Sequence, residues 1–151
     1  MLTVHELTSQ SLLEGLDNAE LEKLLSVVSM VRLLRDEHIF REKGICKGIY
    51  MIQNGRIEIS KTTPDGWKQP LVILNPGNFI GEIATLEKTD HATDARALEN
   101  AELILLPKAA FEELEKKDPQ CMLKIIKNIA LVSALNVRRM NEKFLKALVN
   151  Y

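Results

Sequence analysis

The spacing of apolar residues divides the chain into a helical start, a strand-rich middle and a helical end. Between residues 8 and 28 the leucines recur at helical intervals, and Asp17 with Glu20 three residues later has the form of a capping box. This pattern predicts a helix over residues 18–27. From residue 31 onward the apolar runs become short, and the helical rhythm returns at Pro107.

The middle of the chain, about residues 30–106, has the pattern of a β-domain. Short apolar runs separated by glycine and proline predict strands at residues 49–52, 56–60, 71–74 and 103–106. Asn54-Gly55 predicts a hairpin turn, and Pro64-Asp65-Gly66 is another turn signal. Repeated short strands of this kind predict an antiparallel barrel or jelly roll.

The end of the chain predicts two helices. Pro107 opens a short one that ends before Asp118-Pro119, and Pro119 opens a long one without internal glycine or proline. About 32 residues at roughly 1.5 Å each span nearly 50 Å, which exceeds a compact domain of this length. The predicted fold class is therefore mainly β with flanking helices. A double-stranded β-helix (jelly-roll) barrel follows an N-terminal helix and precedes a short helix and a long one (about 119–149), in a single domain over residues 1–151.

The long helix carries two apolar stripes. One has the three-and-four spacing of a heptad seam and contains Leu123, Ile126, Ala130, Ser133, Val137, Met140, Phe144, Ala147 and Tyr151. The other, suited to lie on the barrel, contains Ile125, Ile129, Val132 and Leu135. Two stripes predict two contacts, one within the chain and one with a second copy in a homodimer. The alternative is a helix folded wholly on its own barrel, or frayed past Arg139.

Composition and charge narrow the function classes. The 151 residues are 46% apolar and 27% charged, with a formal net charge of −1, which argues against a general nucleic-acid or anionic-membrane binder. Two cysteines, Cys46 and Cys121, fit a reducing compartment. The sequence has no run of 18 apolar residues and no signal-like N-terminus. We therefore expect a soluble cytoplasmic protein without a membrane segment.

Residues 78–86 carry the most specific local chemistry. They predict a strand end, a turn at Gly81 and the start of a helix, with the carboxylate of Glu82 beside the glycine. Backbone N–H groups at a helix start can hold a phosphate, and the carboxylate can accept a hydrogen bond from a ribose hydroxyl. The alternative is a turn glycine next to a carboxylate that serves only the fold.

The order of these patterns resembles the cyclic nucleotide-binding domain, the sensor half of the catabolite activator and fumarate-nitrate regulator family. The matching segments are residues 39–44, 49–59, 64–66, 74–82 and 95–97, and the resemblance runs from residue 12 to about residue 141. It implies a jelly-roll barrel with a cassette that binds a cyclic phosphate.

In that family the cassette opens with Gly-Glu-x-Ala, which falls on Gly81, Glu82 and Ala84. The resemblance implies that the amides of Ile83 and Ala84 face the phosphate. It also implies that Glu82 binds the ribose 2′-hydroxyl.

The cassette closes with Arg-Ser/Ala-Ala-Thr, and here the chain departs from the family. His91 stands at the arginine that pairs with the phosphate, followed by Ala92 and Thr93, and Asp94 stands where an uncharged residue is usual. A neutral histidine offers one N–H and no charge, so we expect cyclic-nucleotide affinity to fall about ten- to a hundredfold. Protonated His91 would recover part of this loss, making binding stronger at low pH. The alternative for His91 is a solvated loop position.

Carboxylates crowd the same segment. Glu82, Glu87, Asp90 and Asp94 share it with one lysine, Lys88. We expect an acidic rim that repels a phosphate further. Arg96 is expected to be a structural strand residue rather than a substitute for the missing arginine.

On the predicted long helix, the base-contacting positions implied by the family fall near Val132, Asn136 and Val137. Asn136 alone among them can hydrogen-bond a purine edge. Its alternative role is to fix the register of a helix pair.

Together these features predict a regulatory, cyclic nucleotide-binding-like sensor module for cAMP or cGMP. We expect a homodimer that transmits its ligand state through the last helix to an unknown protein partner, without a DNA-binding domain in this chain. The alternative is a degenerate module that binds no nucleotide and serves dimerisation or scaffolding. A metal-dependent jelly-roll enzyme is a third possibility, but the histidines show no metal-ligand spacing, so we expect no metal, no cofactor and no catalytic residues.

Overall fold

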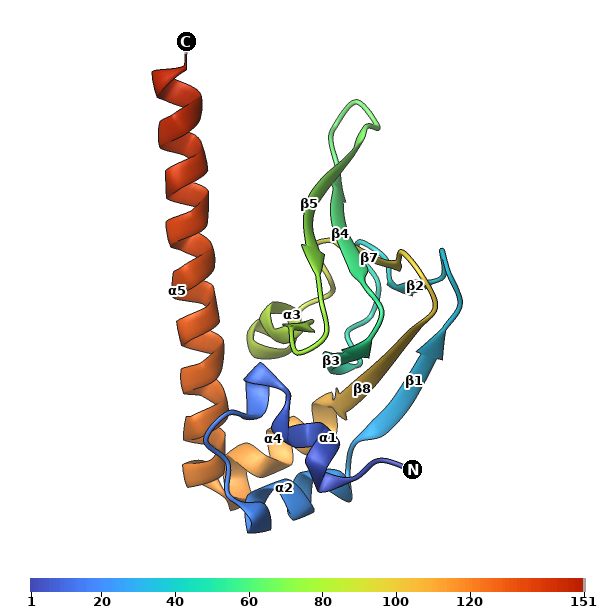
Figure 1. The fold of residues 1–151 in the computed structure, drawn as a ribbon, viewed down its shortest axis with the longest axis vertical. Coiled ribbons are helices and arrows are strands. Elements are labelled where there is room, and N and C mark those ends of the chain that lie inside the picture. The colour runs from blue at the N-terminus through green and yellow to red at the C-terminus, as the bar shows by residue number, and fades with distance from the viewer. Residues whose placement is uncertain (151) are drawn as a thin grey trace.

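The computed structural model describes residues 1–150 and is built on two four-stranded antiparallel sheets (Figure 1). The sheet orders are β1-β8-β3-β6 and β2-β7-β4-β5. The strands are β1 (Ser29–Leu33), β2 (His38–Phe40), β3 (Gly48–Asn54), β4 (Ile57–Thr62), β5 (Lys68–Leu74), β6 (Phe79–Ile80), β7 (Asp94–Ala97) and β8 (Ala101–Pro107). This arrangement confirms the predicted jelly-roll fold class.

Helices flank the sheets at both ends of the chain. They are α1 (Val4–Thr8), the 3₁₀ helix η1 (Ser11–Leu13), α2 (Asn18–Leu25), α3 (Glu82–Glu87), α4 (Lys108–Lys117) and α5 (Pro119–Val149). The capping box of α2 is confirmed, because Asp17 Oδ1 accepts from the Glu20 N–H at 2.8 Å and Glu20 Oε1 accepts from the Asp17 N–H at 2.9 Å. The sequence pattern did not predict α1 or η1, which are each at most five residues long.

The two central strands of the first sheet, β3 and β8, are covered on both faces, which explains their continuous apolar runs. Along β3, Ile49 and Met51 belong to the core shared with the helices, whereas Tyr50 and Ile52 belong to the core between the sheets. Successive side chains of a strand point to opposite faces, so a strand covered on both sides is apolar throughout.

The second sheet is covered on one face only. Ile57 and Ile59 of β4 enter the core between the sheets. β5 lies at the edge of this sheet, where Leu71, Val72 and Ile73 are each about half exposed. The predicted turn at residues 64–66 is confirmed, since β4 and β5 pair as an antiparallel hairpin around it.

The hairpin expected at Asn54-Gly55 is wrong. β3 pairs with β6 and β8, while β4 pairs with β5 and β7, so this turn connects the two sheets instead of closing one pair. Gly55 has a φ of 86°, and a Cβ there would lie 2.7 Å from the Cβ of Ala101. The turn residues report the backbone conformation correctly, but they carry no information about which strands pair.

The long helix α5 has 31 residues and extends past the rest of the molecule, beside the projecting β4–β5 hairpin (Figure 1). Its buried residues, Cys121, Met122, Ile125 and Ile129, all lie in the first half. The predicted barrel-facing stripe is therefore right for Ile125 and Ile129, and Val132 also packs against the core, but Leu135 is 43% exposed. By length and composition alone, α5 would also qualify to cross a membrane.

Candidate functional site

A cavity of about 310 Å³ lies between the barrel, α3 and α5. All eight residues predicted as ligand contacts line it: Gly81, Glu82, Ile83, Ala84, His91, Ala92, Thr93 and Asn136. The structure thus brings together side chains from the turn, the following loop and the last helix. Whether they contact a ligand stays a prediction.

Gly81 begins α3 in a conformation that only glycine adopts easily. Its φ is 92°, and a Cβ would lie 2.6 Å from the Gly48 carbonyl oxygen. Its own carbonyl accepts both the N–H of Thr85 at 3.1 Å and the Thr85 hydroxyl at 2.8 Å. The close approach to β3 therefore fixes where the first turn of α3 begins.

His91 forms part of the cavity wall. The alternative interpretation, a solvated loop histidine, is therefore wrong. Its side chain is only 4% exposed, and its ring stacks on Phe40 with centroids 3.5 Å apart and planes 4° from parallel. The backbone holds it in place, since its N–H donates to the Gly44 carbonyl at 3.0 Å and its carbonyl accepts from the Lys43 N–H at 2.7 Å.

The chemistry of His91 follows from this burial. Burial lowers the pKa of the imidazole, and the nearby Asp90 opposes this only in part. Its Nε2 is buried and has no hydrogen-bond partner among the described residues. Burial therefore favours the neutral form of the ring, and one of its nitrogens lacks a hydrogen-bond partner among the described residues.

Three carboxylates line the cavity, namely Glu82, Glu87 and Asp90. Burial raises the pKa of Glu82 above its usual value, because the charged form loses hydration there. Of the four carboxylates expected at the rim, these three are placed as predicted.

Asp94 is the exception, since it does not line the cavity. Its Oδ2 pairs with Lys68 Nζ at 2.8 Å, and its Oδ1 accepts from the Glu42 N–H at 2.6 Å. Burial alone would raise the pKa of Asp94, but these two hydrogen bonds outweigh it and hold the pKa below its usual value. Asp94 therefore ties β7 to neighbouring segments and adds no free charge to the rim.

Arg96 is a structural strand residue, as predicted. Its guanidinium pairs with Asp36 at 2.6 Å and with Glu58 at 3.2 Å, and it does not line the cavity. No lysine or arginine is among the residues that form the cavity wall within residues 1–150. Among the described residues, no side chain of the cavity wall takes the place of the arginine that other family members have at the position of His91.

Asn136 is exposed on α5 and brings that helix into the cavity wall. Neither Val132 nor Val137 lines the cavity. The sequence analysis missed most of the apolar wall, which consists of Phe40, Ile59, Val72, Leu74, Phe79 and Ile80, and it also missed Thr89. Ordinary strand patterning marks these apolar residues as core, and nothing in that pattern shows that some of them face a cavity.

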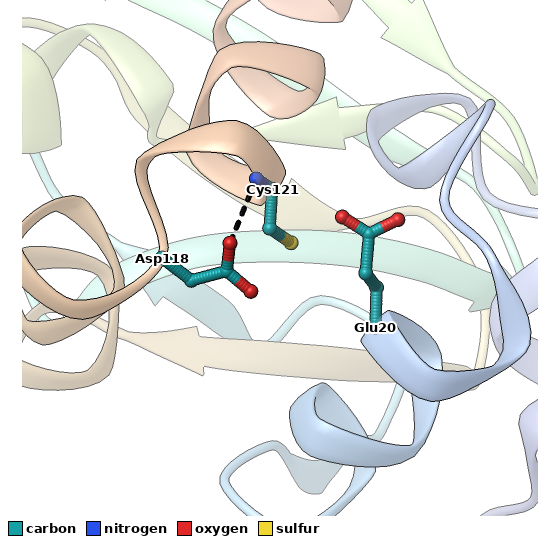
Figure 2. A group of neighbouring side chains, drawn as sticks. All are labelled: Glu20, Asp118 and Cys121. Carbon is teal, nitrogen blue, oxygen red and sulfur yellow. Dashed lines mark hydrogen bonds between the residues drawn. The ribbon is translucent and has the colours of Figure 1, made fainter.

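A second side-chain cluster joins α2 to the start of α5 (Figure 2). Potential ligand atoms of Glu20, Asp118 and Cys121 lie within 4.8 Å of one another. Lys124 pairs with Glu20 at 2.5 Å, and Lys23 pairs with Asp118 at 3.2 Å. Burial, then the two carboxylates, raises the pKa of the Cys121 thiol to about 12.

The sequence did not predict this cluster, because residues about 100 positions apart meet in it. Two ammonium groups neutralise its carboxylates, and its thiol keeps its proton. A metal ion bound here would have to displace both ammonium groups and the proton of the thiol. We therefore interpret the cluster as an ion-pair junction that holds α5 against the N-terminal helices.

Comparison with known proteins identifies the family. The model of the cyclic nucleotide-binding domain matches residues 30–118, which is more than half of the chain. The chain therefore belongs to the cyclic nucleotide-binding domain family, as the resemblance implied.

Individual relatives are distant. The chain is 26% identical over 131 residues to the cyclic AMP receptor protein of Thermus thermophilus, covering 87% of this chain and 57% of that protein. It is 30% identical over 92 residues to lysophospholipase NTE1 of Chaetomium globosum, covering 61% of this chain and 6% of that enzyme. The chain thus spans less than two thirds of either relative.

One solved structure shares the fold at a TM-score of 0.78 with 22% identity, covering 93% of this chain and 50% of the other. It is the regulatory subunit of a cAMP-independent protein kinase A from Trypanosoma brucei, in a variant with three substitutions bound to cAMP. At this identity the likeness shows the fold alone.

Proposed function

We propose that this chain is a single ligand-sensing domain of a regulatory protein, which passes its ligand state to a protein partner through α5. The observation that carries this proposal is that Gly81, Glu82 and His91 share one cavity with Asn136 of α5. A molecule in this cavity touches both the barrel and the helix. Ligand binding can then favour one position of α5 over another.

The proposal includes a homodimer formed through α5. From Ala134 to Asn150 every residue is exposed, including the seam residues Met140 at 68% and Phe144 at 64%. Exposed apolar residues in a continuous stripe are typical of a protein interface. A second copy of the same helix offers a matching stripe and can cover the first.

Cyclic nucleotides are the first ligands to test, because the family and the Thermus relative are named for them. We expect weak binding, since neutral His91 replaces a permanent charge. The Trypanosoma protein is described as cAMP-independent, yet its variant binds cAMP, and one of the three substitutions replaces threonine with arginine. By analogy, His91→Arg in this chain should raise cAMP affinity about ten- to a hundredfold.

The test is calorimetric titration of the whole chain with cAMP and cGMP, at pH 6 and pH 7.5, for the wild type and for His91→Arg. Binding of either nucleotide supports a cyclic-nucleotide sensor. Arg96→Gln is the matched control, because Arg96 lies outside the cavity wall and should not alter affinity. If His91→Arg folds normally but gains no affinity, the missing arginine is not what limits nucleotide binding.

A second candidate is a dimerising or scaffolding module that has lost its ligand. The carboxylates Glu82, Glu87 and Asp90, with no lysine or arginine among the described residues of the cavity wall, favour this alternative. It predicts a stable dimer whose mass and hydrogen-exchange pattern in α5 do not respond to any small molecule. A ligand-dependent change in α5 exchange would contradict it.

We propose a cytoplasmic location and no catalytic role. The first half of α5 covers the core through residues such as Ile125 and Ile129, so its insertion into a bilayer would uncover that core. Recovery of the protein in the membrane fraction after salt washing would contradict the location.

A further inference from the structure

The charge of the cavity wall points away from an anionic ligand. Glu82, Glu87 and Asp90 line it, and within residues 1–150 no lysine or arginine does. A phosphate placed among these groups would face three potential negative charges without a cation. Partial burial strengthens such repulsion, because water screens it less.

Lys88, next to Glu87, is exposed and does not line the cavity, and two other lysines near this region are already engaged. Lys68 pairs with Asp94 at 2.8 Å. Lys61 donates to the Ala92 carbonyl at 2.9 Å and lies 3.7 Å from Glu42. Recruiting either ammonium to a phosphate would break an existing contact and leave a carboxylate or carbonyl without its partner.

His91 is placed to accept or donate a single hydrogen bond. Its ring is locked flat on Phe40, is 4% exposed, and has a buried Nε2 without a partner. An unsatisfied buried nitrogen in a cavity wall is costly unless another molecule satisfies it. The charged side chains of the wall are carboxylates, which accept hydrogen bonds, and the nitrogen of this ring can accept one as well.

From this arrangement, and resting on the sensor function proposed above, we infer that the natural ligand of the cavity is an organic molecule without a phosphate or other anionic group, rich in hydroxyl or amino donors. Donors of the ligand would bind Glu82 and the nitrogen of His91. Its less polar part would lie against the apolar wall formed by residues such as Ile59 and Leu74. A cavity of about 310 Å³ suits a small molecule of this kind.

The test uses matched probes that differ in the phosphate. Adenosine is compared with cAMP, and guanosine with cGMP, by calorimetry on the whole chain at pH 7.5. We expect at least one nucleoside to bind about ten- to a hundredfold more tightly than its cyclic nucleotide. His91→Arg should reverse this preference, because it places a cation where the phosphate would lie.

Two further variants locate the effect. Glu82→Gln keeps the size of the side chain but removes its charge, so it should weaken nucleoside binding about tenfold. Glu99→Gln, a carboxylate outside the cavity wall that pairs with Arg56, should leave binding unchanged.

The outcomes separate the ligand class from the sensor function. Tighter wild-type binding of cAMP or cGMP than of the matching nucleoside overturns the inferred ligand class and leaves the sensor function intact. If none of the four probes binds, the sensor function itself loses its support, and the inference falls with it.

Discussion

The two halves of α5 have the same kind of sequence and opposite surroundings. Up to Val132 the helix packs on the core, and Ile125 and Ile129 are buried there. From Ala134 onward it has no cover within the described chain, although Met140 and Phe144 are equally apolar. The spacing of apolar residues along a helix therefore locates an apolar stripe, but it does not show which surface packs against that stripe.

The strongest test of this contrast is truncation of one side chain in each half. Ile125→Ala should lower the free energy of unfolding by about 2–5 kcal/mol, because it opens a cavity in the core. Leu148→Ala removes the same kind of surface from a residue that is 58% exposed, and should cost less than about 0.5 kcal/mol. Urea denaturation of dilute protein measures both, and equal losses would show that the second half is packed too.

Substitutions in the exposed half of α5 should change the affinity of the homodimer rather than the stability of the fold. Phe144→Glu places a charge in the proposed seam and should weaken the homodimer at least about a hundredfold, or about 2.7 kcal/mol. Sedimentation equilibrium measures the dissociation constant, and circular dichroism checks that the helix persists. Lys143→Glu is the neighbouring control, expected to leave the dimer in place. A wild type that is monomeric at all concentrations would rule out the dimer.

The junction between α2 and α5 holds the packed half in place. Glu20→Ala removes the capping bond to the Asp17 N–H and the partner of Lys124, and should cost about 1–3 kcal/mol. Glu22 lies exposed on the same helix, so Glu22→Ala should change stability little. Thermal unfolding of both variants measures these losses of stability. Similar losses for the two would show that the junction does not help to hold α5 in place.

The smallest expected effect is a pH dependence from the cavity wall. The pKa of buried His91 lies below that of the unfolded chain, about 6.5, so the unfolded state takes up a proton first as pH falls. Stability should therefore decrease below about pH 6.5, by at most about 1.4 kcal/mol per pH unit, and His91→Gln should lack this loss. The raised pKa of Glu82 and the lowered pKa of His38 are common to both proteins and cancel in the comparison.

The readout for that prediction is urea denaturation of wild type and His91→Gln from pH 7.5 to pH 5. Parallel curves would mean that His91 is not held neutral by burial. The same pKa shift bears on ligand binding. Burial disfavours protonation of His91, so any gain in anion affinity that depends on the protonated ring should occur below about pH 6.5.

Much of the site was predictable because its residues are close in sequence. The turn at Gly81, the carboxylate of Glu82 and the loop at His91 lie within 11 positions, and their spacing carries the family pattern. The burial of His91 was not predictable, because its ring stacks on Phe40 of β2, which is about 50 positions earlier in the sequence. A polar residue in a loop is usually exposed, and the stacking on Phe40 contributes to removing this ring from water.

Taken by itself, the sequence determined the capping box at Asp17, the strands β3, β4, β5 and β8, the long last helix and the segment that contains the candidate site. These features depend on contacts within a few residues, so local pattern is enough to find them. The tertiary structure decided which strands pair across the turn at Gly55, that Glu20 meets Asp118 and Cys121, and that α5 closes the cavity at Asn136. Each of these contacts joins residues distant along the chain, and their geometry exists only once the two sheets and the helices have packed together.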